Sequence, residues 1–207
     1  MSGPSMLHEF KLLMTVQAYP AFLAFRTIRG FSGWIQVALA YPVLVYHFGA
    51  SPAMLGVAVF LTGIPFIVLG PWLGGSADRR SPIAMMAVGS AYRVAGLVAL
   101  GWAPSIEIFI VVMFFNAVAG SASAAEPVVL SRLLAAEQIR SATSIGGFLD
   151  LGTKLVAPLI GVAIAWMGEM QRGYYLLAFM AALSLVCALM LGRTVGWASP
   201  AAPDRPK

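Results

Sequence analysis

The sequence has few charged residues and a single cysteine, and it lacks the motifs of the common catalytic classes. Only 10% of its 207 residues are charged, whereas soluble domains carry about 25%. The lone Cys187 excludes a disulfide within the chain and is typical of a small buried apolar residue. The GxxxxGK[ST] phosphate loop, the HExxH zinc motif and the GxSxG nucleophile motif are all missing. These absences argue against a soluble domain, an ATP-driven pump, a zinc protease and a serine hydrolase. We therefore expect neither enzyme activity nor a cofactor.

Long apolar runs take up most of the chain instead. The sequence is 60% hydrophobic, and its mean hydropathy is +0.86. A helix needs about 20 mainly apolar residues to cross a bilayer. Six runs approach or exceed that length, and they predict an all-α membrane protein with six transmembrane helices. The expected spans are Phe22–Phe48, Ala53–Leu73, Ile83–Ala103, Ile106–Ser131, Ala142–Met167 and Tyr174–Gly192.

Shorter segments flank the expected transmembrane domain of residues 22–193. Residues 1–21 are too mixed to span a membrane, but Leu7, Phe10, Leu13 and Met14 share one helical face. That pattern predicts a short amphipathic helix in the cytoplasmic interface, or else a docking arm for a partner. No pattern of a cleaved signal peptide is present. The tail 194–207 is rich in proline and polar residues and is predicted to be disordered.

The basic residues follow membrane topology and do not cluster into a nucleic-acid patch. Net charge is +5, and short basic loops collect on the cytoplasmic side of a membrane. The expected spans place Arg172 alone in a loop on the other side. We therefore predict an integral protein of a bacterial cytoplasmic (inner) membrane with both termini cytoplasmic and no nucleic-acid partner. The residues on the cytoplasmic side are Lys11, Arg26, Arg29, Arg79, Arg80, Arg132, Arg140, Arg193, Arg205 and Lys207.

Three charged residues lie inside the expected spans. Arg93 stands near the middle of the third span, where a charge costs about 2.5–3.5 kcal/mol on insertion scales. We expect it to face a cavity or a partner chain, with an anion nearby. Asp150 and Lys154 lie four residues apart on one face of the fifth span, in the order that favours an ion pair. They are either a self-neutralising pair or a titratable, substrate-binding pair in a central cavity.

The first and fourth spans carry further candidates. Arg29 either extends toward the lipid headgroups or lines a cavity entrance. Asn116 begins a run of small residues that is typical of close helix packing or, alternatively, of substrate contact. Glu126 lies near the cytoplasmic end of its span, within expected reach of Arg132 or water. Pro127 predicts a kink or a helix end there. His8 and His47 fall on opposite membrane sides, so no metal site is expected.

The stretch Gly70–Arg80 lies between the second and third spans as an expected polar hinge. Asp78 can cap the following helix or hold an arginine. The stretch resembles the loop signature G-x-L-A-D-R-x-G-R-R of the major facilitator superfamily, and the preceding Gly-Pro pair resembles its siderophore-exporter and macrolide-efflux-like branch. The matching residues are Gly74, Ala77, Asp78 and Arg79, and the departures are Ser76, Ser81, Pro82 and Ile83.

Two other stretches extend the resemblance, which covers about residues 22–192. Arg29–Gln36 resembles the start of the branch's first helix, and Ala157–Gly161 resembles the family's Gly-Pro-x-x-Gly. Family members often carry an arginine followed four residues later by glycine in the fourth helix. Here Asn116 and Gly120 take that spacing, so the arginine's proton-linked role does not carry over. The resemblance implies transport, and efflux in that branch. In the family the loop aspartate and arginine lock an inner gate against the other half, and here we expect Asp78 and Arg79 to engage each other, nearby helix ends or a partner chain.

The resemblance is to the amino-terminal half of a twelve-helix transporter. We hypothesise a half-size transporter that moves a small solute, with an anion suggested by Arg93, and that works as a homodimer or with a partner half. The alternative is a non-transporting structural or assembly subunit of a larger membrane complex. A third possibility is a truncated product. In each case the partners are the bilayer and whatever membrane subunit covers the charged face.

Overall fold

The computed structural model describes residues 6–168 and 170–197, with the backbone alone described for Met6 and Asp78. Within this part the chain forms six helical spans that are long and apolar enough to cross a membrane. The chain is therefore an integral membrane protein with an all-α fold, as predicted. The first span joins α2 to a π-helical turn, and the fourth joins α5, a 3-10 turn and α6. The elements are α1 Met6–Met14, α2 Tyr19–Pro42, η1 Val43–His47, α3 Pro52–Arg79, α4 Pro82–Gly101, α5 Ile106–Gly120, η2 Ser121–Ala125, α6 Glu126–Leu133, α7 Ala136–Trp166 and α8 Gly173–Val195.

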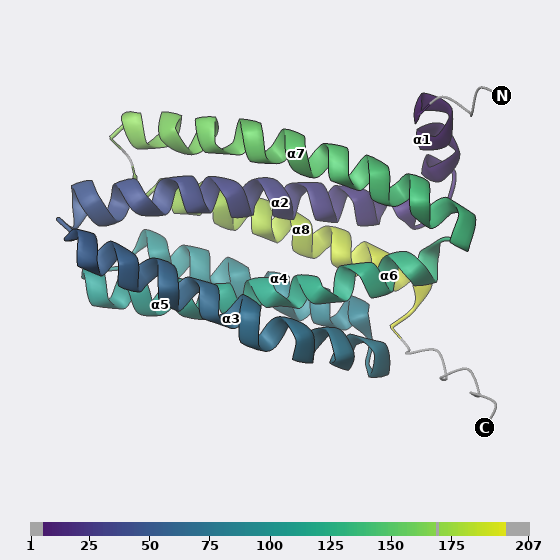
Figure 1. Cartoon of the computed structure of the whole chain (residues 1–207), viewed down its shortest axis with the longest axis horizontal. Coiled ribbons are helices and arrows are strands. Elements are labelled where there is room, and N and C mark those ends of the chain that lie inside the picture. Colours follow the sequence, from purple (N-terminus) through teal and green to yellow (C-terminus); the bar gives the residue numbers. More distant parts are fainter. Residues whose placement is uncertain (1–5, 169, 198–207) are drawn as a thin grey trace.

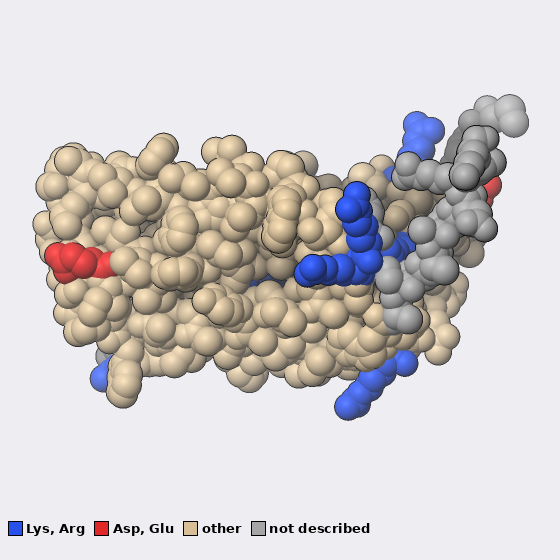
Figure 2. Space-filling view, turned by 90° about the horizontal axis from the view of Figure 1, so that it is seen from below, with Lys and Arg blue, Asp and Glu red and all other residues tan. Residues whose placement is uncertain are grey.

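The spans run side by side along the long axis of the molecule (Figure 1). Helix α1 lies across one end of this bundle, and α8 finishes at the same end. We call it the terminal end. On the face shown in Figure 2, most basic side chains gather toward the terminal end, and the few other charged side chains lie near one end or the other. The wide uncharged belt between them is the surface that a bilayer requires.

The helices pack in an internally symmetric pattern. The main contacts are α2 with α7 and α8, α4 with α8 and α5, and α3 with α5. Exchanging the first and fourth, second and fifth, and third and sixth spans maps these contacts onto themselves. This is the pattern of a nested repeat of three helices, as found in halves of membrane transporters. It leaves α3 and α7 outermost: in their most apolar windows 11% and 22% of residues are buried, against 33–50% in the other spans.

Serine side chains begin three of the spans. Ser51, Ser81 and Ser105 each accept a hydrogen bond from the backbone N–H three residues later, at 3.2–3.4 Å. These bonds satisfy donors that the first helical turn leaves unpaired. Proline follows the first two serines, at a position where its missing N–H has no cost. Ser81 therefore caps α4, which was one of the two roles expected for Asp78.

Glycines allow two pairs of spans to approach closely. A Cβ at Gly161 would lie 2.7 Å from the Cβ of Ala38, and a Cβ at Gly89 would lie 2.6 Å from that of Ala122. No real side chain could occupy either position without moving a helix. In a bilayer, helices associate through such contacts of small residues. Gly161 ends the Ala157–Gly161 stretch singled out in the sequence, and its role here is to seat α7 on α2.

The expected hinge at residues 70–80 is helical as far as Arg79. Helix α3 continues through Pro71 to Arg79, six residues beyond the expected end of the span. Packing explains the difference, since Ala77 is fully buried and its carbonyl accepts a hydrogen bond from Arg132 at 3.5 Å. Burial of the last turns offsets the poor helix propensity of the glycines there.

The expected kink near Pro127 takes a specific form. The irregular part is the 3-10 turn Ser121–Ala125, which precedes the proline. Helix α6 then begins at Glu126 and carries Pro127 in its first turn, where proline is tolerated. At the chain ends, α1 and the start of α2 at Tyr19 occupy the expected interfacial segment. Residues 198–207 of the expected disordered tail lie outside the described part.

Candidate functional site

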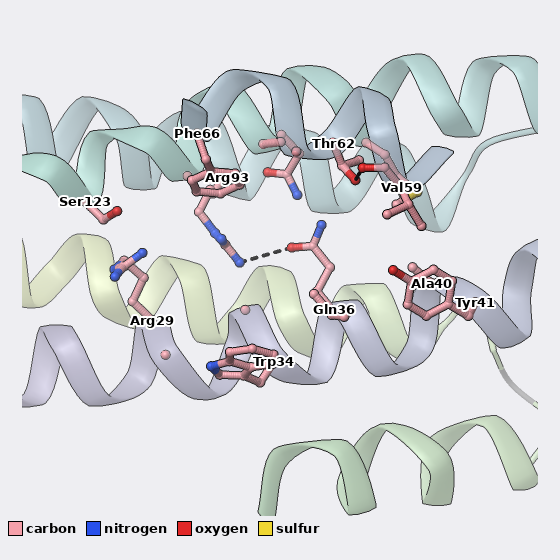
Figure 3. A pocket seen from close by; sticks show the side chains of 18 of the residues that line it. Arg29, Trp34, Gln36, Ala40, Tyr41, Val59, Thr62, Phe66, Arg93 and Ser123 are labelled. Carbon is pink, nitrogen blue, oxygen red and sulfur yellow. Dashed lines mark hydrogen bonds between the residues drawn. The ribbon is translucent and has the colours of Figure 1, made fainter. Parts of the chain in front are cut away.

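A cavity of about 490 Å³ opens on the side of the bundle between α2, α3 and α5. Figure 3 shows its walls, with Arg29, Gln36 and Tyr41 on α2 opposite Val59, Thr62 and Phe66 on α3. Helix α4 contributes Arg93, α5 contributes Met113, Asn116, Ala117 and Gly120, and α7 contributes Asp150. The cavity therefore combines apolar walls with charged groups from spans distant in sequence. That combination is typical of a site for a small organic molecule.

Arg93 projects from α4 into the interior of the bundle. The residue is 8% exposed, and its Nη2 donates to Gln36 Oε1 at 3.2 Å and to Ser32 Oγ at 3.3 Å. Figure 3 shows the guanidinium crossing the gap toward α2. Ser32 and Gln36 lie one turn apart on the same face of α2, so they form a neutral cradle. Among the described residues no carboxylate forms an ion pair with Arg93. Its positive charge is solvated by dipoles but not neutralised.

Arg29 and Glu126 form an ion pair between α2 and the start of α6. Arg29 Nε lies 2.7 Å from Glu126 Oε1, and the two side chains are 23% and 10% exposed. Neither atom has an aligned hydrogen-bond partner in the described part, so the contact is an ion pair set by charge and distance. The prediction gave Glu126 the guanidinium of Arg132 or water as its partner. Arg29 takes that place, at the point where the 3-10 turn ends and α6 begins.

Asp150 and Lys154 form an ion pair along α7. Lys154 Nζ lies 2.7 Å from Asp150 Oδ2, and the ammonium stands 5.6 Å from the centre of the Trp34 ring. The two charged side chains are 42–43% exposed. Asp150 also lines the cavity. The pair is thus internally neutral and forms the open rim of the cavity on one of the two outermost spans.

Asn116 lies on α5 at the back of the cavity. It is 2% exposed, and neither its Nδ2 nor its Oδ1 has a hydrogen-bond partner among the described residues. Close packing with small residues is also present, since a Cβ at Gly96 would lie 3.0 Å from Oδ1. Close packing, one of the two alternatives raised by the sequence, is therefore present at this residue, and substrate contact stays a prediction.

The four residues of the loop signature lie away from this cavity, on the last turns of α3. A Cβ at Gly74 would lie 4.0 Å from that of Ala124, Ala77 is fully buried, and Arg79 is exposed. The side chain of Asp78 lies outside the described part. Gly74 and Ala77 therefore pack the end of α3 against η2 and α6.

The structure brings the predicted interior residues into one region. Arg29, Arg93, Asn116 and Asp150 line the cavity, and Glu126 and Lys154 join it through their ion pairs. Sequence reasoning assigned no role to the partners of these groups, which are Ser32, Gln36 and Trp34. Their signal was a series of polar side chains on one face of an apolar span, near an arginine expected in the interior. Within the described residues no group of three His, Cys, Asp or Glu side chains could hold a metal.

Comparison with known proteins agrees with this architecture. The family model of the Major Facilitator Superfamily matches residues 13–207. The chain is also similar to the uncharacterized MFS-type transporter YfiS of Bacillus subtilis (strain 168), with 22% identity over 186 residues. That alignment covers 89% of this chain and 45% of the relative. The chain therefore spans about half of the length of this curated relative.

Proposed function

This chain belongs to the major facilitator superfamily, and on that premise we propose that it forms one six-helix side of a transport pathway. Its solute is a small anion that binds in the cavity beside Arg93. The observation that carries this proposal is the state of Arg93, a buried cation in a membrane span whose described partners are all neutral. A charge in that position is costly and marks substrate pathways in membrane proteins. A bound anion would offset the cost of placing the Arg93 charge inside the membrane.

A second six-helix unit completes the pathway in this proposal. Facilitators enclose their site between two six-helix halves and alternate its access by rocking them. Two features support the need for a covering unit. The spans α3 and α7 are the most exposed, and the half-exposed Asp150–Lys154 pair on α7 would otherwise face lipid. That unit is a second copy of this chain or a different six-helix unit. Chemical cross-linking between cysteines placed on α7, followed by mass measurement, distinguishes a homodimer from a mixed pair.

The direction and orientation form a further part of the proposal. The excess of basic residues near one membrane face supports cytoplasmic termini in a bacterial inner membrane, and the branch resemblance supports efflux. Cysteines introduced at Ser51 and Ser81, in a Cys187→Ala background, test the orientation in intact cells. A membrane-impermeant thiol reagent should label position 51 from outside and leave position 81 unlabelled. Labelling of both positions from outside would overturn the arrangement.

Flux of labelled organic anions into proteoliposomes tests the function itself. Arg93→Ala should abolish saturable uptake, whereas Arg93→Lys should retain part of it because the charge remains. Arg193→Ala is the matched control, since Arg193 is an exposed arginine in the last turn of α8. Equal uptake by wild type, Arg93→Ala and empty vesicles would contradict the proposal.

A non-transporting assembly subunit is the second candidate. The observation that favours it is Asn116, which stands where the family often has an arginine on the fourth helix. Purification from native membranes in a mild detergent separates the two functions. Stable co-purification with unrelated subunits, together with absence of flux, supports the assembly role.

A further inference from the structure

The amide of Asn116 is a buried polar group without a partner among the described residues. Polar side chains in spanning helices ordinarily hydrogen-bond to a neighbouring helix, and an unmade buried hydrogen bond lowers stability. A leucine of similar size at this position would avoid that loss. The residue lines the cavity and is only 2% exposed, so its unpaired donor and acceptor lie in the wall that a bound ligand would contact.

The packing of α4 against α5 holds this amide close to Arg93. Gly96 follows Arg93 on α4 and makes room for the Asn116 amide, whose Oδ1 would lie 3.0 Å from a Cβ there. Gly120 follows Asn116 on α5 and makes room for the guanidinium, whose Nη1 would lie 3.9 Å from a Cβ there. The two polar groups are thus about one helical turn, or roughly 5 Å, apart along the bundle. One small ligand can reach both.

The charges around the cavity sum to a single uncompensated positive charge. Arg29 is paired with Glu126, and Lys154 with Asp150. The described partners of Arg93 are the neutral Ser32 and Gln36. A monoanion balances this arrangement, whereas a dianion would leave a buried negative charge. The carboxylate geometry also suits a guanidinium, which can donate two parallel hydrogen bonds.

The remaining walls of the cavity are mainly apolar and partly aromatic. They include Val37 and Tyr41 on α2, Val59 and Phe66 on α3, and Met113 on α5. Apart from a few hydroxyls such as that of Tyr41, this surface offers no hydrogen bonds to an inorganic anion but buries hydrocarbon favourably. The ligand therefore has an organic body.

We propose that the cavity takes an organic monoanion that also carries a neutral hydrogen-bonding group, and that Asn116 is the residue that selects for that group. Arg93 binds the anionic group, a carboxylate or a phosphodiester, the apolar walls hold the body, and the Asn116 amide both donates to and accepts from a hydroxyl or amide on the ligand. The proposal rests on the proposed function in that both place an anion on Arg93. The same chemistry occurs in two sources, a free hydroxylated carboxylate and the headgroup of an anionic phospholipid such as phosphatidylglycerol.

Equilibrium binding to the full chain in phosphatidylcholine nanodiscs tests the selection. The probes are radiolabelled 4-hydroxybenzoate and benzoate, which differ by one hydroxyl. Wild type should bind 4-hydroxybenzoate about tenfold more tightly, as expected for one buried hydrogen bond of about 1.4 kcal/mol. Asn116→Leu should bring 4-hydroxybenzoate down to the benzoate value and leave benzoate unchanged. Ser121→Ala is the matched control, because this buried hydroxyl on the same span already donates to the Ala117 carbonyl at 3.2 Å.

Two further variants keep the test decisive if Asn116→Leu folds poorly. Gly96→Ala crowds the amide and should reduce the preference for the hydroxyl. Asn116→Asp places a carboxylate beside Arg93 and should abolish binding of both probes.

Asn116→Leu should also unfold at a temperature equal to or above that of wild type, since it removes an unpaired polar group. A preference for 4-hydroxybenzoate that survives in Asn116→Leu overturns the proposal. So does a lower unfolding temperature with unchanged binding, which would make the amide structural.

A second set of discs distinguishes the two sources. Discs that contain phosphatidylglycerol should protect wild type but not Asn116→Leu against unfolding if the ligand is a lipid headgroup, and the benzoates should then compete poorly. If neither 4-hydroxybenzoate nor phosphatidylglycerol binds in a way that depends on Asn116, the proposal is overturned. Asn116-dependent binding without flux would refute the transport function alone. Flux that requires Arg93 but ignores Asn116 would refute the selection alone.

Discussion

Replacing Arg29 by methionine removes the cation that faces the Glu126 carboxylate between α2 and α6. The Glu126 side chain is only 10% exposed, so the variant leaves a nearly buried acid in a membrane span. Removing one partner of a buried pair typically costs about 3–5 kcal/mol. Because the Arg29 side chain is 23% exposed, water already screens part of the attraction. We therefore expect Arg29→Met to lower the free energy of unfolding by about 2–3 kcal/mol.

The opposite substitution should be less harmful. Glu126→Gln leaves an arginine, whose long side chain can extend toward water or headgroups, so we expect a loss of about 1–2 kcal/mol. The double variant leaves neither charge behind and should be close to Glu126→Gln. The resulting coupling between Arg29 and Glu126 is about 2–3 kcal/mol, near the upper end for residues in contact.

The free energies of unfolding of wild type, the two single variants and the double variant can be measured in mixed micelles with increasing dodecyl sulfate. Tryptophan fluorescence reports the unfolding. Arg140→Met, at an exposed arginine in the first turns of α7, controls for loss of a cation without loss of the pair. If the two single effects add within about 0.5 kcal/mol in the double variant, the pair contributes nothing and the reasoning is refuted.

Three further changes test the packing and the cavity rim. Gly161→Ala should lower the free energy of unfolding by about 1–3 kcal/mol because the new methyl group meets α2, whereas Gly147→Ala, with nothing within 4 Å of its Cβ, should be neutral or slightly stabilising. Ser81→Ala should cost about 1 kcal/mol through loss of the α4 cap, and Ser81→Asn should restore most of it. Trp34→Leu should cost about 0.5–1 kcal/mol through loss of the ring beneath Lys154, and that cost should disappear in a Lys154→Gln background. An unchanged midpoint in Gly161→Ala, Ser81→Ala or Trp34→Leu contradicts the corresponding contact.

The transmembrane fold was readable from local features of the chain. Each span is recognised from about 20 adjacent residues, because the cost of placing them in hydrocarbon adds up residue by residue. The ion pair between Asp150 and Lys154 was equally local, since residues four apart on a helix are neighbours wherever the helix lies. The family could be inferred from the short Gly70–Arg80 signature for the same reason.

The end of α3 and the partner of Glu126 could not be predicted from adjacent residues. The sequence of Gly70–Arg79 has the composition of a turn, and it is helical because Ala77 and its neighbours pack against η2 and α6. Glu126 meets Arg29, nearly a hundred residues earlier in the chain, where the 3-10 turn passes into α6. Both outcomes depend on contacts between segments that the sequence does not pair.

The sequence by itself determined that the chain crosses a membrane with six helices and that charges lie inside it. Only the tertiary structure decided that Arg93 rests on Ser32 and Gln36, and that the Asn116 amide is left unpaired beside it. The physical reason is that hydropathy depends on composition along one segment. The partner of a buried polar group depends instead on how two helices are rotated and spaced against each other, which in this bundle follows from where glycines such as Gly96 and Gly120 let them approach.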